Sequence, residues 1–413
     1  MSRSRGALSH NFAMDSVSVA VAGAGIGGLA AALALSRAGC RVRAFEQTDH
    51  LAEVGAGVQL GANAVRVLDA LGVGPSLQRV AALPRQLRVH SARDGAALAT
   101  IELGERHQQR YGAPYLCVHR ADLHALLLHA AHASGAFELQ LGRRVQQLAD
   151  LPAADAVVAA DGLWSALRAS IDPEGPLAQP TGHWAWRGMV ETASLPASQR
   201  SDDVCVWLGP RLHGVRYPVR GGEWLNWVIV LQGDAHDRGL APSQAEPRSW
   251  DLVPEPAQLQ AALAACAPAL REAIASVDGW RRWRLFDVPP VRGPQALVRG
   301  RAVLLGDAAH PMRPYLAQGA GMAIEDAWVL AQCLAPHGTA AGGSVESVES
   351  RLARYAALRW QRCAQVQARA QRNGRIFHAQ GVVRWARDAA LRTLGARLLD
   401  QPWLYAGGPL PPR

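Results

Sequence analysis

A glycine-rich segment near the start of the chain, Gly23–Gly28 with the sequence GAGIGG, constrains the fold most strongly. An apolar run precedes it and a run of small residues follows it, so we expect a buried strand, a tight turn and a helix. In such a turn Gly23 lets the chain reverse, Gly25 lets the backbone approach a pyrophosphate, and Gly28 lets the helix pack closely on the strand. The helix N-terminus adds amide donors, and the pattern therefore predicts a dinucleotide-binding site.

A second predicted strand, residues 41–45, ends at Glu46. A carboxylate at this place accepts hydrogen bonds from both hydroxyls of an adenosine ribose and disfavours a 2′-phosphate. A glycine-rich turn without a ligand would explain the glycines but not Glu46. This part of the sequence leaves the choice between NAD and FAD open.

Two later segments have the same strand-turn-helix pattern, and each places an aspartate at the turn: Asp161 in Ala160-Asp161-Gly162 and Asp307 in Gly306–Pro311. With these motifs the chain resembles the class A FAD-dependent aromatic monooxygenases, the para-hydroxybenzoate hydroxylase superfamily, from Val17 to about Tyr405. The resemblance implies an α/β fold. A glutathione-reductase-like Rossmann domain that binds FAD would be interleaved with an antiparallel-sheet substrate domain, and C-terminal helices would follow.

Composition shifts and the resemblance together give the expected domain boundaries. We expect a disordered tail over 1–13, an FAD-binding domain over 14–80, 112–175 and 293–342, a substrate-binding domain over 81–111 and 176–292, and a C-terminal helical region over 343–413. The segment between Arg144 and Asp155 is shorter than in relatives that carry a hairpin there, so we expect a trimmed sheet near the adenine.

The resemblance also assigns roles to residues that bind the cofactor. Asp307 would bind the ribityl hydroxyls, and the helix that begins at Gln318-Gly319-Ala320-Gly321 would point at the flavin, whose reduced form is an anion that a helix N-terminus stabilises. Asp161 and Gly162 would serve both FAD and NAD(P)H. Further FAD contacts are implied at Gly57, Val58, Arg120, Val145 and Gly306. Arg120 could instead be a solvated arginine at a helix start.

The catalytic prediction rests on the segment Arg211–Val219. In a strand, His213 and Tyr217 share one face. They resemble the His-x-x-x-Tyr pattern of the branch that contains 3-hydroxybenzoate 6-hydroxylase, 6-hydroxynicotinate 3-monooxygenase and many salicylate hydroxylases. That resemblance implies that His213, with a pKa near neutrality, takes a phenolic proton, that Tyr217 holds the phenol oxygen or a carboxylate, and that Pro314 lies beside the reactive edge of the flavin. Without it, His213 and Tyr217 would be ordinary buried residues of a strand.

Aromatic and imidazole side chains elsewhere leave further choices open. The predicted antiparallel strands between His183 and Leu231 are rich in tryptophan, which suits an aromatic substrate. For most of these indoles, however, ordinary core and sheet-face positions are the better explanation. The histidines of one predicted helix, His124, His129 and His132, lack metal-binding spacing, and we expect them on a solvated face. No metal site is predicted.

The charge balance narrows the choice of partners. The net charge is +9, from 43 Lys+Arg against 34 Asp+Glu, and the sequence contains no lysine, which excludes Schiff-base and phosphate-loop lysine chemistry. The arginines are scattered, so we expect no nucleic-acid partner. They favour anionic small molecules, although a genome rich in arginine codons would explain them as well.

The spacing of the cysteines and the hydropathy of the chain indicate the cellular compartment. The six cysteines occur singly, without zinc or disulfide spacing, as in reduced cytoplasmic proteins. No apolar run is long enough to cross a membrane, so no membrane partner is expected. We expect a cytoplasmic monomer or homodimer.

The family resemblance implies an enzyme that hydroxylates a small phenolic or N-heteroaromatic acid through a C4a-hydroperoxyflavin, with or without loss of a carboxylate. FAD would be the bound cofactor, NADH or NADPH a transient co-substrate, and O2 the oxidant. Two alternatives are a related FAD oxidoreductase without oxygen insertion and a non-catalytic flavin-binding regulatory protein.

Overall fold

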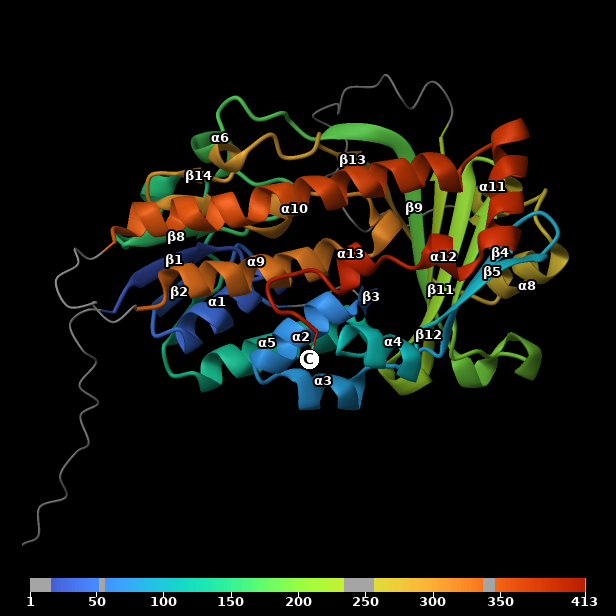
Figure 1. Cartoon of the computed structure of the whole chain (residues 1–413), viewed down its shortest axis with the longest axis horizontal. Helices are drawn as coiled ribbons and strands as arrows, with labels where there is room; N and C mark the ends of the chain where they lie inside the picture. Colours follow the sequence, from blue (N-terminus) through green and yellow to red (C-terminus); the bar gives the residue numbers. More distant parts are fainter. Residues whose placement is uncertain (1–15, 52–55, 234–255, 337–345, 413) are drawn as a thin grey trace, which may run out of the picture.

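The computed structural model describes residues 16–51, 56–233, 256–336 and 346–412, and the tail predicted over 1–13 lies outside these ranges. Two sheets dominate the described residues, and Figure 1 shows one in each half of the elongated molecule. The long helix α10 (Val348–Phe377) runs across both halves. The C-terminal region therefore connects the two sheets instead of forming a separate unit.

The first sheet has six strands, and all neighbouring pairs are parallel except the pair at one edge, β14 with β15. In order across the sheet the strands are β14 (Val298–Arg299), β15 (Ala302–Leu304), β8 (Ala156–Ala159), β1 (Ser18–Ala22), β2 (Arg41–Phe45) and β7 (Phe137–Gln140). Parallel strands end at one edge of a sheet, so the turns after β1, β2, β8 and β15 lie together. Those turns carry Gly23, Glu46, Asp161 and Asp307.

The second sheet has seven strands and is antiparallel except where β10 pairs with β4. In order the strands are β13 (Arg281–Asp287), β9 (Gln179–Glu191), β12 (Trp224–Gln232), β11 (Leu212–Val219), β10 (Val204–Gly209), β4 (Gln86–Ser91) and β5 (Ala97–Glu102). The antiparallel strands predicted between His183 and Leu231 are confirmed. A small ribbon of β3 (Gly57–Leu60) and β6 (Leu116–His119) lies between the sheets.

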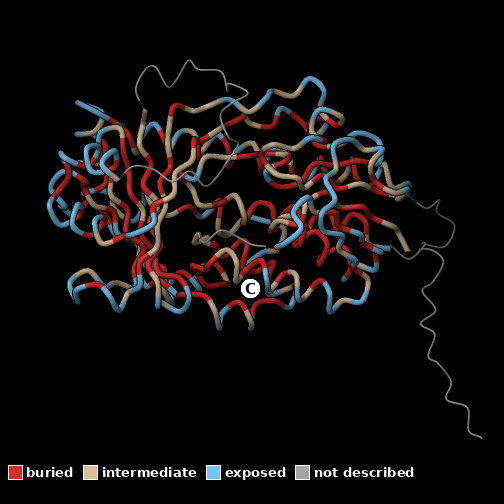
Figure 2. The backbone as a smooth tube through the Cα atoms, turned by 180° about the vertical axis from the view of Figure 1, so that it is seen from behind, coloured by how far each residue is buried: buried red, intermediate tan, exposed pale blue. Residues whose placement is uncertain are grey.

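Helices cover both sheets. Besides α10 they are α1 (Ile26–Arg37), α2 (Ala62–Ala70), α3 (Gly74–Val80), α4 (Glu105–Tyr111), α5 (Arg120–Ala133), α6 (Arg168–Ile171), α7 (Pro256–Ala262), α8 (Pro268–Ala275), α9 (Gly319–Leu334), α11 (Gly381–Leu394), α12 (Ala396–Leu399) and α13 (Pro402–Tyr405). Ten of the twelve residues of α1 are buried, because its small side chains let it pack between the sheet and its neighbours. Figure 2 shows the buried positions gathered along the strands and inner helices, and exposed ones along the rim.

Two predictions concern the outline of the fold. Residues 141–155 contain only a 310 turn, Leu148–Asp150, so the extra hairpin is absent from this fully described segment, as predicted. Within the described ranges, none of the helices has both the length and the apolar character needed to cross a membrane.

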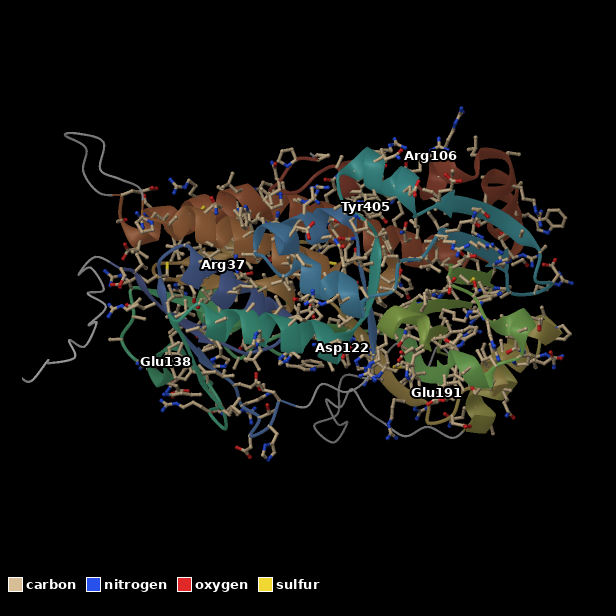
Figure 3. All side chains as sticks on the ribbon, turned by 90° about the horizontal axis from the view of Figure 1, so that it is seen from below. Arg37, Arg106, Asp122, Glu138, Glu191 and Tyr405 are labelled. Atoms are coloured by element: carbon tan, nitrogen blue, oxygen red, sulfur yellow. The ribbon has the colours of Figure 1, made fainter. Side chains whose placement is uncertain are left out.

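Charged side chains lie over both halves of the molecule in Figure 3. Asp122 on α5, which is labelled there, accepts a hydrogen bond from Arg220 Nε at 3.2 Å.

Candidate active site

The glycine-rich turn joins β1 to α1 with room for a ligand. Gly23 has a φ of +97°, and a Cβ there would lie 2.4 Å from the Ala160 carbonyl oxygen, so only glycine fits. A Cβ on Gly28 would lie 2.0 Å from the Gly23 oxygen, which is the close packing expected of this position. A Cβ on Gly25 would meet no atom within 4 Å. No side chain caps α1, so its N-terminal amides face this open space.

Glu46 lies directly beside this turn. Its Oε2 accepts a hydrogen bond from the Ala24 amide at 2.9 Å, and its Oε1 accepts one from the Thr48 amide at 3.1 Å. These two bonds orient the carboxylate at the end of β2 before any ligand binds. On α5, His124 supports the same turn, because its Nε2 lies 2.7 Å from the Ala24 oxygen. His124 is buried, so the predicted solvated helix face is wrong for this residue.

The turn after β8 holds an aspartate with one oxygen unused. Asp161 Oδ2 accepts from the Ala166 amide at 2.8 Å, whereas Oδ1 is buried and has no partner among the described residues. Gly162 has a φ of +80° and leaves open space where a Cβ would lie. Val145 lies in the loop before β8 and packs against the small core cluster that contains Phe45 and Leu167. A buried carboxylate oxygen without a partner is consistent with a site where a ligand donates a hydrogen bond to it.

Asp307 lies in the turn after β15, where cations from other segments surround it. Burial raises the pKa of its carboxyl, and the charges of His310, Arg120 and Arg168 act in the opposite direction. Arg168 also donates to the Asp307 carbonyl oxygen at 3.0 Å. Asp307 is nevertheless exposed to solvent, so the pKa effect comes from the protein packed around the turn and the residue itself remains accessible to a ligand. Gly306 has a φ of +61°, and a Cβ there would lie 3.0 Å from that of Ala323.

A buried ion-pair network fixes this turn to α9 and α10. Asp326 Oδ2 lies 2.5 Å from His310 Nε2 and accepts from the Gly306 amide at 3.1 Å, while Oδ1 accepts from Arg359 Nε at 2.7 Å. Burial raises the pKa of Asp326, but the charges of His310 and Arg359 outweigh this effect, and the net pKa is lowered. Together with Cys363 the cluster resembles a ligand set, yet the amide and Arg359 already occupy the carboxylate. The network therefore acts as a structural anchor.

Helix α9 begins beside Asp307. Gln318 precedes its first turn and does not cap it, because the Gln318 Oε1 accepts from Asn63 Nδ2 at 3.1 Å. The amides of Gly319, Ala320 and Gly321 lie in the first turn of α9 and so have no intrahelical acceptor. The Asp307 Oδ1 lies 3.9 Å from a Cβ built on Gly319, so Asp307 is next to this turn. A helix N-terminus at this place attracts negative charge.

The strained backbone before α9 was not predicted. Ala317 adopts a φ of +51°, a left-handed conformation that residues with a Cβ rarely adopt, and this turn redirects the chain into the helix. Strain of this kind gathers at ligand sites.

These features together fit FAD. The glycine turn leaves a cradle for a pyrophosphate, Glu46 is oriented for a ribose, Asp307 offers a carboxylate to hydroxyls, and the open N-terminus of α9 suits an anionic ring. They come from four segments that the parallel sheet brings to one edge.

His213 and Tyr217 share one face of β11, as predicted, and Arg216 lies on the other face. The Tyr217 hydroxyl donates to the Gly57 carbonyl oxygen at 2.7 Å, and a Cβ on Gly57 would lie 2.3 Å from the Tyr217 ring. The Gly57 amide in turn donates to Asn226 Oδ1 at 2.8 Å. Gly57, with its neighbour Val58 on β3, therefore ties the ribbon to the seven-stranded sheet. In this structure the Tyr217 hydroxyl donates its proton to the Gly57 carbonyl oxygen.

His213 lies in a buried aromatic cluster. Its ring centroid is 5.0 Å from that of Tyr315 and 5.4 Å from that of Phe377. Burial lowers the pKa of His213 to about 3, which differs from the near-neutral value expected, because no solvent stabilises the imidazolium. Its ring is therefore neutral at pH 7. Pro314 precedes Tyr315, is exposed, and lies between this cluster and the start of α9.

The tryptophans of the sheet lie mainly on the opposite face. Trp186 and Trp227 are buried against α7 and α8, with Trp184 and Trp207 beside them, so these indoles belong to a separate core. The interpretation of these four indoles as ordinary core and sheet-face residues, which the sequence favoured, is confirmed. On the face that carries His213, sequence reasoning missed Trp283, which packs with Leu285 and Tyr315, and His378, which lies at the end of α10.

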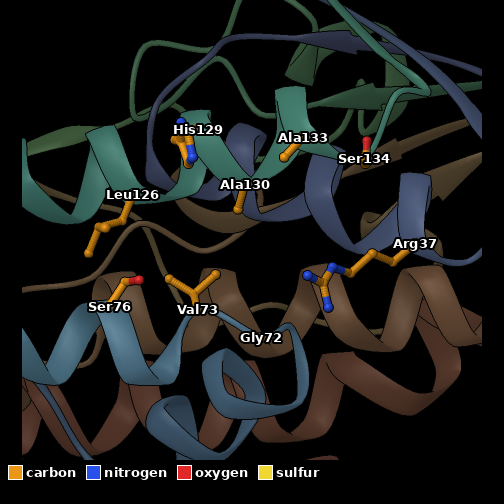
Figure 4. A pocket seen from close by; sticks show the side chains of 9 residues that line it. All are labelled: Arg37, Gly72, Val73, Ser76, Leu126, His129, Ala130, Ala133 and Ser134. Atoms are coloured by element: carbon orange, nitrogen blue, oxygen red, sulfur yellow. The ribbon is translucent and has the colours of Figure 1, made fainter.

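A surface pocket lies away from these groups. It has a volume of about 240 Å³ and lies between α1, α5 and the turn into α3, as Figure 4 shows. Arg37 and His129 line it, and Arg37 stands at the end of α1 opposite the glycine turn. None of the predicted site residues reaches this pocket.

Comparison with known proteins agrees with the geometry. The FAD binding domain family model matches residues 16–370. The 3-hydroxybenzoate 6-hydroxylase of Polaromonas naphthalenivorans (strain CJ2) is 35% identical over 94% of this chain and 95% of its own length. The 3-amino-4-hydroxybenzoate 2-monooxygenase PtnB3 of Streptomyces platensis is 37% identical over the same shares of the two chains.

A solved structure agrees as well. Klebsiella pneumoniae HpxO complexed with FAD and uric acid superposes with a TM-score of 0.78 and 25% identity, and covers 95% of this chain and 96% of its own. The fold class predicted from the sequence is confirmed, and FAD is the cofactor that the fold and the family share. The chain belongs to the class A FAD-dependent aromatic monooxygenases, in the branch that contains the 3-hydroxybenzoate 6-hydroxylases.

Proposed function

We propose that the protein hydroxylates a small phenolic or N-heteroaromatic acid with NAD(P)H and O2. The observation that carries this proposal is the position of His213. Its ring packs on Tyr315, the residue next to Pro314, and this short turn leads directly into the N-terminus of α9 beside Asp307. An acid-base group on the sheet is thus joined by one turn to the cradle that fits the flavin.

The residues divide the work between binding and proton transfer. Gly23, Gly25 and Gly28 leave room for the pyrophosphate, and Glu46 would hold the adenosine ribose. Asp307 would hold the ribityl chain, and the amides at 319–321 would stabilise negative charge on the ring. Bound FAD supplies the redox and oxygen chemistry. His213 would take the phenolic proton.

The remaining FAD contacts fit the same assignment. Arg120 begins α5, where its amide donates to Ala56 at 2.7 Å, and its charge acts on Asp307. Asp161 Oδ1 has no partner within the described structure, and there is open space where a Cβ on Gly162 would lie. This space would accommodate a transiently bound nicotinamide cofactor. Val145 would contact the adenine through its backbone. The chain has no second glycine-rich nucleotide motif, which fits transient binding of NADH or NADPH.

The names of two relatives support a proposal for the class of substrate. Both name hydroxybenzoates, which carry a hydroxyl and a carboxylate. We propose that this protein acts on the same class of substrate, and that it is a monomer or homodimer in the cytoplasm. The six cysteines are free and buried, which suits a reducing compartment.

The test is a screen of NADH and NADPH oxidation. The FAD-loaded protein would be incubated with hydroxybenzoates, salicylate, anthranilate and hydroxynicotinate, and the product mass would be measured. We expect at least one acid to accelerate NAD(P)H oxidation and to gain one oxygen atom. Oxidation without any oxygenated product from every acid would favour an FAD oxidoreductase that does not insert oxygen.

A further inference from the structure

His378 is held at the end of α10 by three elements. Its amide donates to the Gly374 oxygen at 3.2 Å, and its own carbonyl accepts from the Arg211 amide, just before β11, at 3.3 Å. On α11, Arg387 Nη1 donates to the Phe377 oxygen at 2.7 Å and so caps the helix. The backbone that carries His378 is therefore fixed relative to the strand that carries His213.

The two imidazole rings share a hydrogen bond. His213 Nδ1 lies 2.8 Å from His378 Nε2, and the exposed fractions of the two residues are 2% and 6%. Burial lowers the pKa of His378 to about 2, and the charges of His213, His183, Arg313 and Arg387 act in the same direction. Burial and His183 lower the pKa of His213 as well. Both rings are therefore neutral at pH 7.

A bond between two neutral imidazoles has two proton arrangements. If His213 Nδ1 carries the proton, its Nε2 is a lone pair that can accept a phenolic proton. His378 then carries its own proton on Nδ1, a buried atom that has no partner among the described residues. If His378 Nε2 carries the proton, the His213 Nε2 is protonated and cannot act as a base. Among the described residues His213 Nε2 makes no hydrogen bond, so it is the atom left for a substrate.

We propose that His378 is a positioning residue that keeps His213 protonated at Nδ1, so that Nε2 takes the phenolic proton. This inference rests on the proposed function. The phenol O–H bond breaks, its electron pair stays on oxygen, and the proton bonds to His213 Nε2. His378 Nε2 continues to accept from Nδ1 and stabilises the imidazolium that forms. A phenol that donates to Nε2 is compatible only with this arrangement.

The test compares two substitutions of His378 with a packing control. His378→Gln keeps an acceptor oxygen near the place of Nε2, whereas His378→Leu removes it. Phe377→Leu is the control, because Phe377 also contacts the His213 ring but through packing alone. We expect His378→Leu to bind FAD normally and to be reduced by NAD(P)H, yet to form product at least tenfold more slowly. His378→Gln should recover most of that rate, and Phe377→Leu should stay within about threefold of the wild type.

A second measurement does not depend on turnover. Nitrogen chemical shifts of labelled histidine, assigned with His213→Gln, report which ring nitrogen is protonated. We expect Nδ1 of His213 to be protonated in the wild type and in His378→Gln, and the proton to shift toward Nε2 in His378→Leu. Protonation at Nε2 in the wild type would overturn the proposal. So would equal loss of rate in His378→Gln and His378→Leu. If no acid is hydroxylated at all, the proposed function fails, and the nitrogen shifts still decide whether His378 sets the tautomer.

Discussion

Two regions of the molecule are built differently. The cofactor edge is the edge of the parallel sheet with Gly23, Glu46 and Asp307, and the substrate face is the face of β11 that carries His213. At the cofactor edge each group follows a strand of one parallel sheet, and backbone amides or ion pairs already orient it. On the substrate face His213, Tyr315 and His378 come from a strand, a 310 turn and the end of a helix. The first region is held by local hydrogen bonds and buried charge, and the second by the packing of distant segments. Substitutions in the first should change cofactor binding and stability, whereas those in the second should change chemistry.

The largest expected effect is on the buried network under the cofactor edge. Asp326→Asn removes the anionic partner of His310 and one of the two buried carboxylates that hold Arg359, the other being Glu325. We expect the free energy of unfolding to fall by about 3–5 kcal/mol. Denaturant titration measures it. Glu138→Gln is the control, because the Arg43–Glu138 pair is exposed and should contribute less than about 1 kcal/mol. A loss below that level in Asp326→Asn would show that the network is dispensable.

The same pair predicts a dependence on pH. The pKa of Asp326 is lowered from its ordinary value of 3.8 in the folded state, so its stabilisation is present above that value and is lost as the pH falls. The pKa of His310 is raised above 6.5, because Cys363 and Asp326 outweigh the opposing effect of burial. Its contribution is therefore complete below pH 6.5 and declines at higher pH. Unfolding of the wild type and of Asp326→Asn between pH 3 and pH 9 should show both slopes only in the wild type.

The second effect concerns FAD affinity. Glu46→Ala removes the acceptor for the ribose, and the loss of hydrogen bonds to a charged group should weaken FAD binding by about 3 kcal/mol. Fluorescence titration of the apoprotein with FAD measures the change. The preference between NADH and NADPH should stay the same, because Glu46 belongs to the resident cofactor. If the variant switched its preference between NADH and NADPH, Glu46 would belong to the nicotinamide site and not to the FAD site.

The contrast also explains what the sequence could predict. The motifs at Gly23, Asp161 and Asp307 have local patterns, and each lies in a turn after a strand as predicted. The predicted helix follows directly only at Gly23, because a loop separates Asp161 from α6 and Asp307 from α9. His124 and His378 carry no local signal, because their partners lie 100 and 165 residues away. The burial that lowers the pKa of His213 is likewise a property of the assembled cluster. Alternation along β11 predicted which face His213 shares with Tyr217, but not which neighbours cover that face.

The third effect tests the substrate face. His213→Ala should still bind FAD and accept electrons from NAD(P)H, but product formation should fall roughly a hundredfold, since a general base typically contributes that much or more. Oxygen consumption should then yield hydrogen peroxide in place of product. Product and peroxide per NAD(P)H consumed would be compared with those of the Phe377→Leu control. If His213→Ala formed as much product per NAD(P)H consumed as the wild type, His213 would have only a packing role.

The smallest expected effect is at Tyr217, where the structure changes the expectation from the sequence. The Tyr217 hydroxyl already donates to Gly57, so Tyr217→Phe should remove one neutral hydrogen bond and lower stability by about 1 kcal/mol. Its ring still packs on Gly57, and FAD content should be unchanged. If the hydroxyl serves only this contact, the substrate KM should change by less than about threefold. If it also accepts a bond from the substrate acid, KM should rise roughly tenfold while stability changes by the same small amount. Measuring both quantities on one variant decides whether Tyr217 belongs to the substrate face or to the framework that joins it to the cofactor edge.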